Sequence, residues 1–285
     1  MIDLHTHTTA SDGRCTPEEL VGRAAAAGVD VLSVTDHDTT AASAAVSTAC
    51  AAAGIDFVPG IEMTAVVDGA DVHILGYFID PDSPPLAAFL ATQRVNRVER
   101  VREMIARLAG LGIELDAESV LGPSREKGKA AGRPWIARAL VSAGVVANTR
   151  EAFDRYLKRG QPAFVPRLGP MPVDVFAQIH EAHGIASLAH PGLLGRDDLI
   201  PAFVAGGLDA IEAHHSKHTA EDTGRYVKMA AHHDVVVTGG SDYHGDPSHD
   251  VVGIGGVPLP PEKFQALRDR CATRRATASP ASTSS

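Results

Sequence analysis

The sequence predicts an α/β fold, a parallel sheet or barrel that is interrupted by a helical insertion. Short apolar runs alternate with helical patterns over residues 1–80 and again after Pro172, and such alternation is typical of parallel sheets and barrels. From about Pro81 the pattern changes to charged amphipathic stretches. The length of 285 residues suits one barrel of roughly 250 residues or about two domains.

Residues 1–80 form the first part of the predicted barrel. The segment Thr16-Pro17-Glu18-Glu19 has the pattern of a helix start, with Thr as N-cap and Pro at the first helical position, and Gly28 is expected to end that helix. The fourth predicted strand, Asp71–Ile79, is expected to pair with Glu62–Val67 across the Asp68-Gly69 turn. The other predicted elements are a second helix at Thr40–Ala53 and strands at Ile2–Leu4, Val29–Thr35, Ile55–Ile61 and Asp71–Ile79.

Residues 81–172, called the insertion below, are predicted to form a helical cap. Its expected helices are Pro84–Gly110, Pro134–Ala143 and Thr149–Leu157, and a glycine-rich basic loop, Gly122–Pro134, lies between them. Residues 173–272 return to the barrel pattern, with a helix at Val173–Ala182 and strands at Ile185–Ala189, Leu208–Ala213 and Val235–Thr238. The tail, residues 273–285, has little to bury and is predicted to be disordered.

Composition and charge exclude several classes of protein. Apolar residues make up 44% and charged residues 21% of the chain, as in soluble globular proteins. The net charge of −9 argues against binding of long nucleic acid, and no apolar run approaches the roughly 20 residues of a membrane span. The odd, widely spaced Cys15, Cys50 and Cys271, with no signal peptide at the start, predict reduced thiols in a cytoplasmic protein.

Nine histidine and carboxylate side chains fall at or near the ends of the predicted strands, where barrels place their chemistry. Alternate residues of a strand share a side, so His5 and His7 can hold one ion together, as can Asp242 and His244. Imidazole mixed with carboxylate suits Mn, Fe or Zn better than Ca or Mg. Nine ligands exceed what one ion can use, so we predict two or three divalent ions. The candidate ligands are His5, His7, Asp12, His37, Glu62, His73, His190, Asp242 and His244. His214, His215 and His218 are candidates to border the site.

Six motifs occur in the order HTHTTASDG, VTDHD, GIE, DVHILGY, LAHPG and GSDYH. Together they resemble the PHP family of metal-dependent phosphoesterases, named for polymerase and histidinol phosphatase. The resemblance covers about residues 1–80 and 173–260, and it implies a distorted seven-stranded (β/α)7 barrel with a trinuclear metal site. Within the insertion, GRPWIARAL and YLKRGQPAFVP resemble a bacterial subgroup of 3′,5′-nucleoside bisphosphate phosphatases, some of which also trim RNA from the 5′ end.

The resemblance also implies how the nine ligands divide. His5, His7, Glu62 and Asp242 would hold one ion. Glu62 would bridge to a second ion, which His73 and His190 also hold. Asp12, His37 and His244 would hold the third. The residues expected to act directly in catalysis are Asp12, His37, Glu62, Asp242 and His244.

Substrate-binding residues are expected in the basic loop of the insertion. The resemblance implies that an Arg and a His two positions later contact the substrate phosphate. Arg133 is present here, but Trp135 stands in the place of that His, where it would stack on a base or pack the cap. Lys127 is the third candidate, with Arg125 and Lys129 adding positive charge nearby.

The predicted function is hydrolysis of phosphate monoesters of nucleotides, above all 3′,5′-nucleoside bisphosphates such as pAp, by attack of a hydroxide activated by Mn²⁺. The expected partner is a small phosphorylated substrate, either a nucleotide or a short oligoribonucleotide, and neither a membrane nor long nucleic acid. One alternative is a 5′–3′ exoribonuclease that acts on short 5′-phosphorylated RNA. Others are a small-molecule phosphatase such as histidinol phosphatase, an amidohydrolase, and a non-catalytic module.

Overall fold

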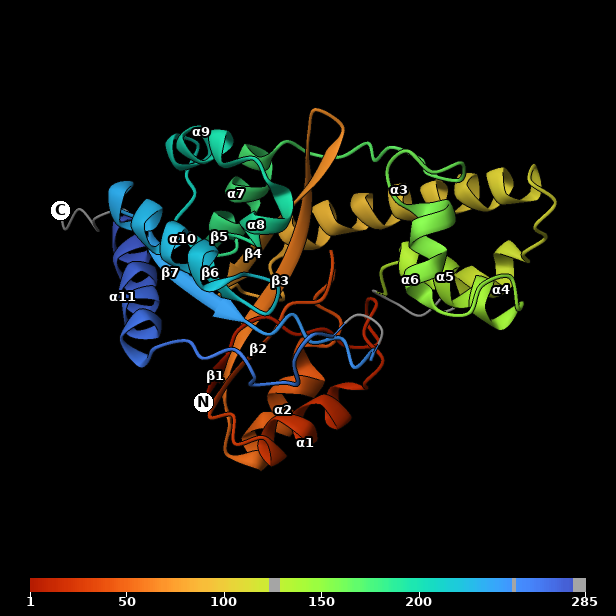
Figure 1. The fold of residues 1–285 in the computed structure, drawn as a ribbon. Helices are drawn as coiled ribbons and strands as arrows, with labels where there is room; N and C mark the ends of the chain where they lie inside the picture. The colour runs from red at the N-terminus through yellow and green to blue at the C-terminus, as the bar shows by residue number, and fades with distance from the viewer. Residues whose placement is uncertain (123–128, 248–249, 279–285) are drawn as a thin grey trace.

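Seven strands form one curled sheet in a computed structural model that describes residues 1–122, 129–247 and 250–278 (Figure 1). The strands lie side by side in chain order, and the first also meets the last, because Leu4 N donates to Gly239 O at 3.3 Å and Asp242 N donates to His5 O at 2.8 Å. The sheet is therefore a nearly closed barrel, as the sequence predicts. The strands are β1 (Ile2–Asp3), β2 (Val31–Val34), β3 (Asp56–Val67), β4 (Ala70–Tyr77), β5 (Ile185–Leu188), β6 (Ala210–His215) and β7 (Val236–Gly240).

Strand β4 runs antiparallel to both of its neighbours, β3 and β5, whereas every other pair in the described sheet is parallel. The start of β4 therefore lies at the edge where the parallel strands end. The β3–β4 turn is the predicted Asp68-Gly69, and both residues have positive φ, 51° and 70°, as a type I′ turn requires. Strand β3 is continuous, so the predicted strand Ile55–Ile61 and its extension Glu62–Val67 form one element.

Helices cover the outside of the barrel and pack on its strands. Helix α1 begins with the predicted capping box, in which Thr16 and Glu19 each bond the backbone N–H of the other. The largest apolar cluster joins β3–β7 to α7 and α10, and a second joins β2 to α1 and α2. The helices of the barrel are α1 (Pro17–Ala26), α2 (Ser43–Ala53), α7 (Pro172–Glu181), α8 (Pro191–Leu194), α9 (Ile200–Ala205), α10 (Ala220–His232) and α11 (Pro261–Ala278).

The insertion forms a group of helices to one side of the barrel, reached along the long helix α3 (Figure 1). These helices pack around a cluster of their own that includes Met104, Leu108, Ile136 and Leu140. The elements are α3 (Pro84–Ala109), α4 (Ala117–Leu121), α5 (Arg133–Ser142), α6 (Thr149–Ala152) and a π-helical turn, η2 (Phe153–Leu157). No helix within the described ranges is long and apolar enough to cross a membrane.

The predicted disordered tail begins too early, because α11 continues through residues 273–278. Polar contacts rather than apolar burial hold these last turns to the barrel. Arg274 Nε donates to Asp209 Oδ1 at 3.1 Å, and Arg275 donates to the carbonyls of His183 at 3.1 Å and Phe78 at 2.6 Å. Composition alone did not indicate these arginine contacts. Residues 279–285 lie outside the described part of the chain.

Candidate metal centre

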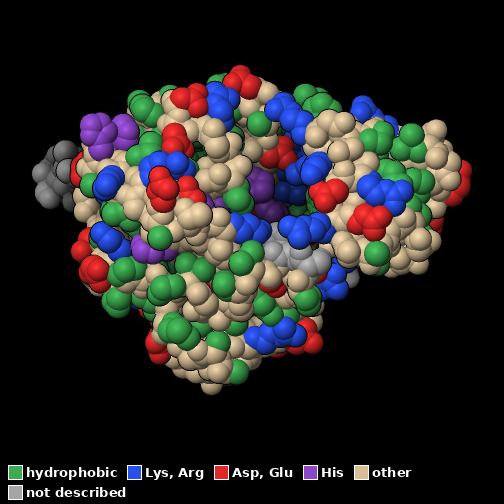
Figure 2. Space-filling view, in the orientation of Figure 1, with side chains coloured by type: hydrophobic (Ala, Val, Ile, Leu, Met, Phe, Trp, Pro, Cys, Tyr) green, Lys and Arg blue, Asp and Glu red, His purple; other side chains and the backbone are tan. Residues whose placement is uncertain are grey.

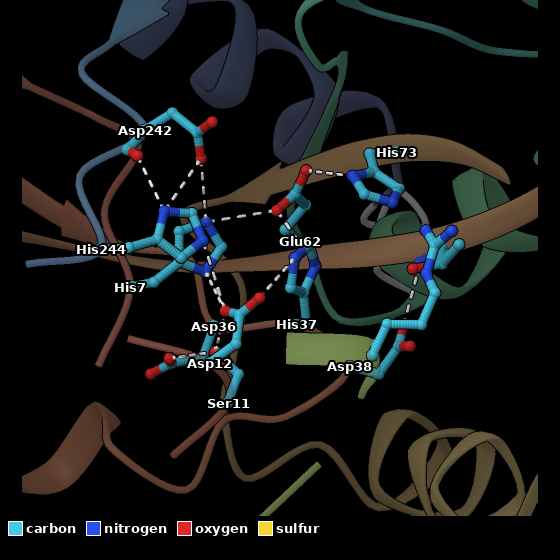
Figure 3. Close-up of polar contacts among 12 residues, drawn as sticks. His7, Ser11, Asp12, Asp36, His37, Asp38, Glu62, His73, Asp242 and His244 are labelled. Atoms are coloured by element: carbon cyan, nitrogen blue, oxygen red, sulfur yellow. Dashed lines mark hydrogen bonds and ion pairs between the residues drawn. The ribbon is translucent and has the colours of Figure 1, made fainter. Parts of the chain in front are cut away.

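All nine predicted ligands converge at the edge of the barrel where the parallel strands end. His5 and His7 follow β1, His37 follows β2, and Glu62 lies within β3. His73 reaches the same edge although it lies inside a strand, because β4 is antiparallel and pairs His73 with Thr64. Figure 3 shows how the side chains of His7, Asp12, His37, Glu62, His73, Asp242 and His244 face one another. The remaining ligands, on the loop after β1 and on the segments after β5 and β7, are Asp12, His190, Asp242 and His244.

Three carboxylates connect the histidines into one network. Glu62 lies at the centre, because its two oxygens lie between 2.8 and 3.3 Å from one ring nitrogen of each of five histidines, His5, His7, His37, His73 and His190. Asp12 lies 3.3 Å from His244 and 3.6 Å from His37. Asp242 Oδ1 lies 3.4 Å from Nε2 of both His5 and His7.

The buried ring nitrogens of this network have the features of cation ligands. In the described chain, His5 Nε2, both ring nitrogens of His7, His37 Nδ1 and His73 Nδ1 are buried without a hydrogen-bond partner, which is rare for buried polar atoms. Here the histidine ring nitrogens and the carboxylate oxygens point at one another. Divalent cations held between them would bind both kinds of atom. Donor atoms of the described residues lie within 4.8 Å of one another in four groups, His5–His7–Asp242, His37–Glu62–His73, His7–Asp12–His37–His244 and His5–Glu212–His215.

The electrostatics show how strongly these groups depend on each other. Burial acts to lower the pKa of His7. The neighbouring Asp242 and Glu62 have the larger, opposite effect, and the pKa is raised to about 10. Burial lowers the pKa of His37 to about 3, although Glu62 and Asp12 act in the opposite direction. Burial raises the pKa of Glu62, but His37 and His73 lower it to well below its usual range. The negative charge of Glu62 is therefore stabilised by positive charge close to it in the site.

A neighbouring carboxylate, Asp36 of the motif VTDHD, positions the loop that carries Asp12 (Figure 3). Its Oδ1 accepts hydrogen bonds from the backbone N–H of Thr8 at 2.8 Å and from Ser11 Oγ at 2.6 Å, and its Oδ2 accepts from Thr8 Oγ1 at 2.6 Å. Asp36 is buried. The loop after β1 is therefore tied to the end of β2, which brings Asp12 toward His37 and His244.

A cavity between the barrel and the insertion opens onto the cluster. Its lining includes Asp12, Glu62, His73 and other predicted ligands on one side, with cationic side chains around them. Figure 2 shows this cavity as a hollow with histidines in its depth and Lys and Arg side chains around it. The cations that line it are Arg97, Arg100, Arg133, Arg138, Arg167 and Lys217. The cavity therefore suits an anionic ligand.

The predicted substrate-binding residues lie in different places. Arg133 lines the cavity, with Nη2 3.3 Å from Asp71 Oδ2. Trp135 is only 6% exposed and packs in the core of the insertion, where its Nε1 donates to Ser11 O at 2.8 Å. Lys129 and Trp135 line a second hollow, which shares Ser11 and Arg138 with the central cavity. Arg125 and Lys127 lie outside the described residues.

Sequence reasoning missed the other cations of the cavity and one carboxylate behind the predicted metal ligands, Glu212. Arg97 and Arg100 are three residues apart on α3, a spacing that places both on one helix face and was a usable signal. Glu212 is fully buried beside His5, and its position late in a predicted strand was also a signal. His215, a candidate to border the site, lies 3.4 Å from Asp242.

The barrel, the converged ligands and the cationic cavity together define a metal-dependent phosphoesterase. Residues 3–121 match the family model described as PHP domain. A 3′,5′-nucleoside bisphosphate phosphatase of Chromobacterium violaceum is 38% identical over 259 residues, which cover 88% of this chain and 90% of that protein. The chain belongs to the PHP family, and it is a hydrolase.

Further relatives agree with this assignment. The 5′-3′ exoribonuclease Rnm of Escherichia coli is 34% identical over 252 residues, covering 86% of this chain and 85% of the relative. A crystal structure from Bifidobacterium adolescentis, described as a candidate metal-dependent phosphoesterase, superposes with a TM-score of 0.86 at 32% identity. That likeness covers 94% of this chain and 96% of the other, so it includes the insertion as well as the barrel.

Proposed function

We propose that this protein hydrolyses 3′,5′-nucleoside bisphosphates such as pAp, releasing AMP and phosphate. The observation that carries this proposal is the pairing of two regions for anions in one cavity. The metal ligands lie on one side, and the arginines of the insertion lie on the other. A substrate with two phosphate groups would place one against each region. The relative from Chromobacterium violaceum carries the name of this activity.

The nine converged side chains are the proposed ligands of two or three divalent ions. We propose Mn²⁺, with Fe or Zn as alternatives, because the donors mix imidazole with carboxylate. The groups formed by the donor atoms support a trinuclear site in which Glu62 is shared. Bound ions of this kind supply Lewis-acid polarisation of a phosphoryl oxygen and lower the pKa of water.

The residues of the insertion are proposed to hold the phosphate that is not hydrolysed. Asp71 lies between two of them, 3.3 Å from Arg133 and 3.7 Å from Arg100, and so fixes both guanidinium groups toward the cavity. Arg100 Nη2 is buried without a hydrogen-bond partner among the described residues, so a bound phosphate oxygen would satisfy it. The insertion would also cover the cavity as a cap and limit the entry of water.

Replacing Arg133 by Ala is expected to raise KM for pAp by about 10- to 100-fold, since a hydrogen bond to a charged group contributes roughly 1.5–3 kcal/mol. The turnover number should change much less, because this contact is made before and during the reaction. Steady-state kinetics of phosphate release measure both values. Arg150→Ala, at an exposed position of α6, is the matched control and should leave KM unaltered. An equal KM for Arg133→Ala and wild type would refute the proposed contact.

A second candidate function is a 5′–3′ exoribonuclease on short RNA. A further hollow, lined by Arg14, Asn148 and neighbouring residues, shares Arg138, Thr149 and Asp246 with the central cavity. This continuation would give room for additional nucleotides. Against it, aromatic residues make up only 5% of the chain and Trp135 is packed away from the cavity, so platforms for base stacking are few.

Parallel assays with Mn²⁺ separate these candidates. Fast conversion of pAp to AMP, with slow decay of a 5′-phosphorylated RNA trimer and of histidinol phosphate, is the expected result. Stepwise release of mononucleotides from the trimer, with pAp spared, would move the function to exoribonuclease. Activity only on histidinol phosphate would replace both. The buried Cys15, Cys50 and Cys271 are free thiols, which supports a cytoplasmic setting for these substrates.

A further inference from the structure

Of the seven strands in the described barrel, β6 is the one that contributes none of the nine proposed ligands, either from the strand itself or from the segment that follows it. Two of its side chains nevertheless lie buried against the metal centre, Glu212 at 0% and His215 at 4% exposure. We infer that Glu212 and His215 are positioning residues, which fix the orientation of the proposed ligands His5, His190 and Asp242 and the ring tautomer of His5. This inference rests on the proposed function, because it assumes that the centre holds ions.

Glu212 uses both of its oxygens on ligand residues. Its Oε1 lies 2.9 Å from His5 Nδ1, and a carboxylate can only accept a hydrogen bond. In the neutral ring the proton therefore sits on Nδ1, and the lone pair remains on Nε2. That nitrogen lies 3.3 Å from Glu62 Oε2 and 3.4 Å from Asp242 Oδ1. Glu212 thus selects the tautomer of His5 that can bind an ion beside Glu62 and Asp242.

The second oxygen of Glu212 holds the turn that carries His190. Oε2 accepts from the backbone N–H of His190 at 2.8 Å, where the chain has a positive φ of 28°, a strained conformation for a residue with a side chain. Two residues on, Gly192 N donates to His218 Nε2 at 3.1 Å. The turn directs His190 Nε2 to within 3.1 Å of Glu62. One carboxylate therefore orients two ligands.

His215 reaches the centre because β6 contains a bulge. Glu212 pairs with Thr238 and His214 with Gly239, so Ala213 is an extra residue that turns His215, rather than His214, inward. His215 Nδ1 accepts from Lys217 N at 3.1 Å, which leaves the proton of the neutral ring on Nε2.

His215 Nε2 lies 3.4 Å from Asp242 Oδ2, the oxygen that Lys217 Nζ also approaches at 3.4 Å. His215 Nε2 makes no hydrogen bond within the described residues, but with its proton in place it faces this carboxylate as a donor and not an ion as a ligand. Oδ2 is occupied from one side, and Oδ1 of Asp242 is left to face Nε2 of His5 and of His7.

The test is a Mn²⁺ titration of the metal-stripped full-length chain, which counts the sites and measures their affinities. In Glu212→Gln one of the two donors must face an amide NH2, so at least one Mn²⁺ should bind about 10- to 100-fold more weakly than in wild type. The melting temperature of the metal-free protein is recorded alongside. Weaker Mn²⁺ binding with an unchanged metal-free melting temperature supports positioning.

Asp209→Asn is the matched control. Asp209 immediately precedes β6 at the opposite end of the barrel, and it too accepts from a histidine and a backbone amide, His180 Nε2 at 2.8 Å and Ala186 N at 3.0 Å. Its substitution should lower the melting temperature but leave the Mn²⁺ affinities as in wild type. Loss of Mn²⁺ affinity in Asp209→Asn equal to that in Glu212→Gln would overturn the inference, because general loosening of the strand would then explain both.

A second pair of variants tests His215 independently, should Glu212→Gln fold poorly. His215→Gln keeps a donor nitrogen near the place of Nε2 and should retain Mn²⁺ affinity, whereas His215→Leu removes the donor and should weaken it. Equal affinities in all variants and wild type would overturn the inference while leaving the proposed function intact. A wild-type chain that binds no Mn²⁺ would overturn both.

Discussion

Replacing Glu62 by Gln is expected to lower phosphate release by about 10³-fold or more at saturating Mn²⁺. Glu62 faces five histidines at 2.8 to 3.3 Å. It therefore contacts more of the proposed histidine ligands than Asp12 or Asp242 does. Bound divalent ions contribute several kcal/mol to stabilisation of a phosphoryl transition state, and each ~1.4 kcal/mol is a factor of ten in rate. Metal content and phosphate release, measured on the same preparation, test this expectation.

The comparison requires a folded Glu62→Gln chain, and the substitution was chosen because it keeps the volume of the side chain. Circular dichroism checks this point. Glu181→Gln makes the same chemical change at an exposed position of α7, and its activity should equal that of wild type. A Glu62→Gln enzyme with wild-type turnover and metal content would remove Glu62 from the centre. Asp242→Asn and Asp12→Asn should also lose activity by orders of magnitude.

Much of the candidate site could be predicted because most of the proposed ligands lie in the strand that places them or within a few residues of its end. A short apolar run followed by a polar residue is a local pattern, and the common direction of parallel strands brings such residues together. This reasoning located His5, His37 and His190. It also located His73, although the reason differs: β4 is antiparallel, so an early position in the strand reaches the same edge as the ends of the others.

The rest depended on features that no local pattern records. Alternation within β6 places Glu212 and His214 on one side, but the bulge at Ala213 sends His215 inward in place of His214. The helix that carries Arg97 and Arg100 could be predicted from its composition, whereas its approach to the metal centre depends on how the insertion packs. The last turns of α11 depend on the contact between Arg274 and Asp209, which are 65 residues apart in sequence.

Replacing Asp38 by Asn is expected to lower the free energy of unfolding by about 3–5 kcal/mol, the usual effect of removing one partner of a buried ion pair. Asp38 is fully buried, and its Oδ2 accepts from Arg97 Nε and Arg167 Nη2, each at 2.6 Å. Both arginines belong to the insertion and line the cavity. The loss would leave the buried Arg167 and the partly buried Arg97 with too little negative charge nearby and would loosen the insertion from the barrel. Urea unfolding of the metal-free protein at pH 7 measures the change.

The pH dependence of this effect has a definite sign. Burial raises the pKa of Asp38, but Arg97 and Arg167 lower it to well below its usual range. A carboxylate with a lowered folded pKa stabilises the protein fully above its unfolded pKa of about 3.9, and this contribution is lost as the pH falls toward the folded value. The difference in unfolding free energy between wild type and Asp38→Asn should therefore shrink below about pH 4.

An exposed ion pair provides the control for Asp38. Asp198 contacts Arg196 at 2.9 Å through both oxygens, but its side chain is 63% exposed. Solvent screens such pairs, so Asp198→Asn should change stability far less at any pH. If the two variants had equal stability, burial of the Asp38 pair would contribute nothing to the attachment of the insertion. If Asp38→Asn instead shows the larger loss together with a raised KM for pAp, the same carboxylate holds the insertion in place and aligns its arginines with the substrate.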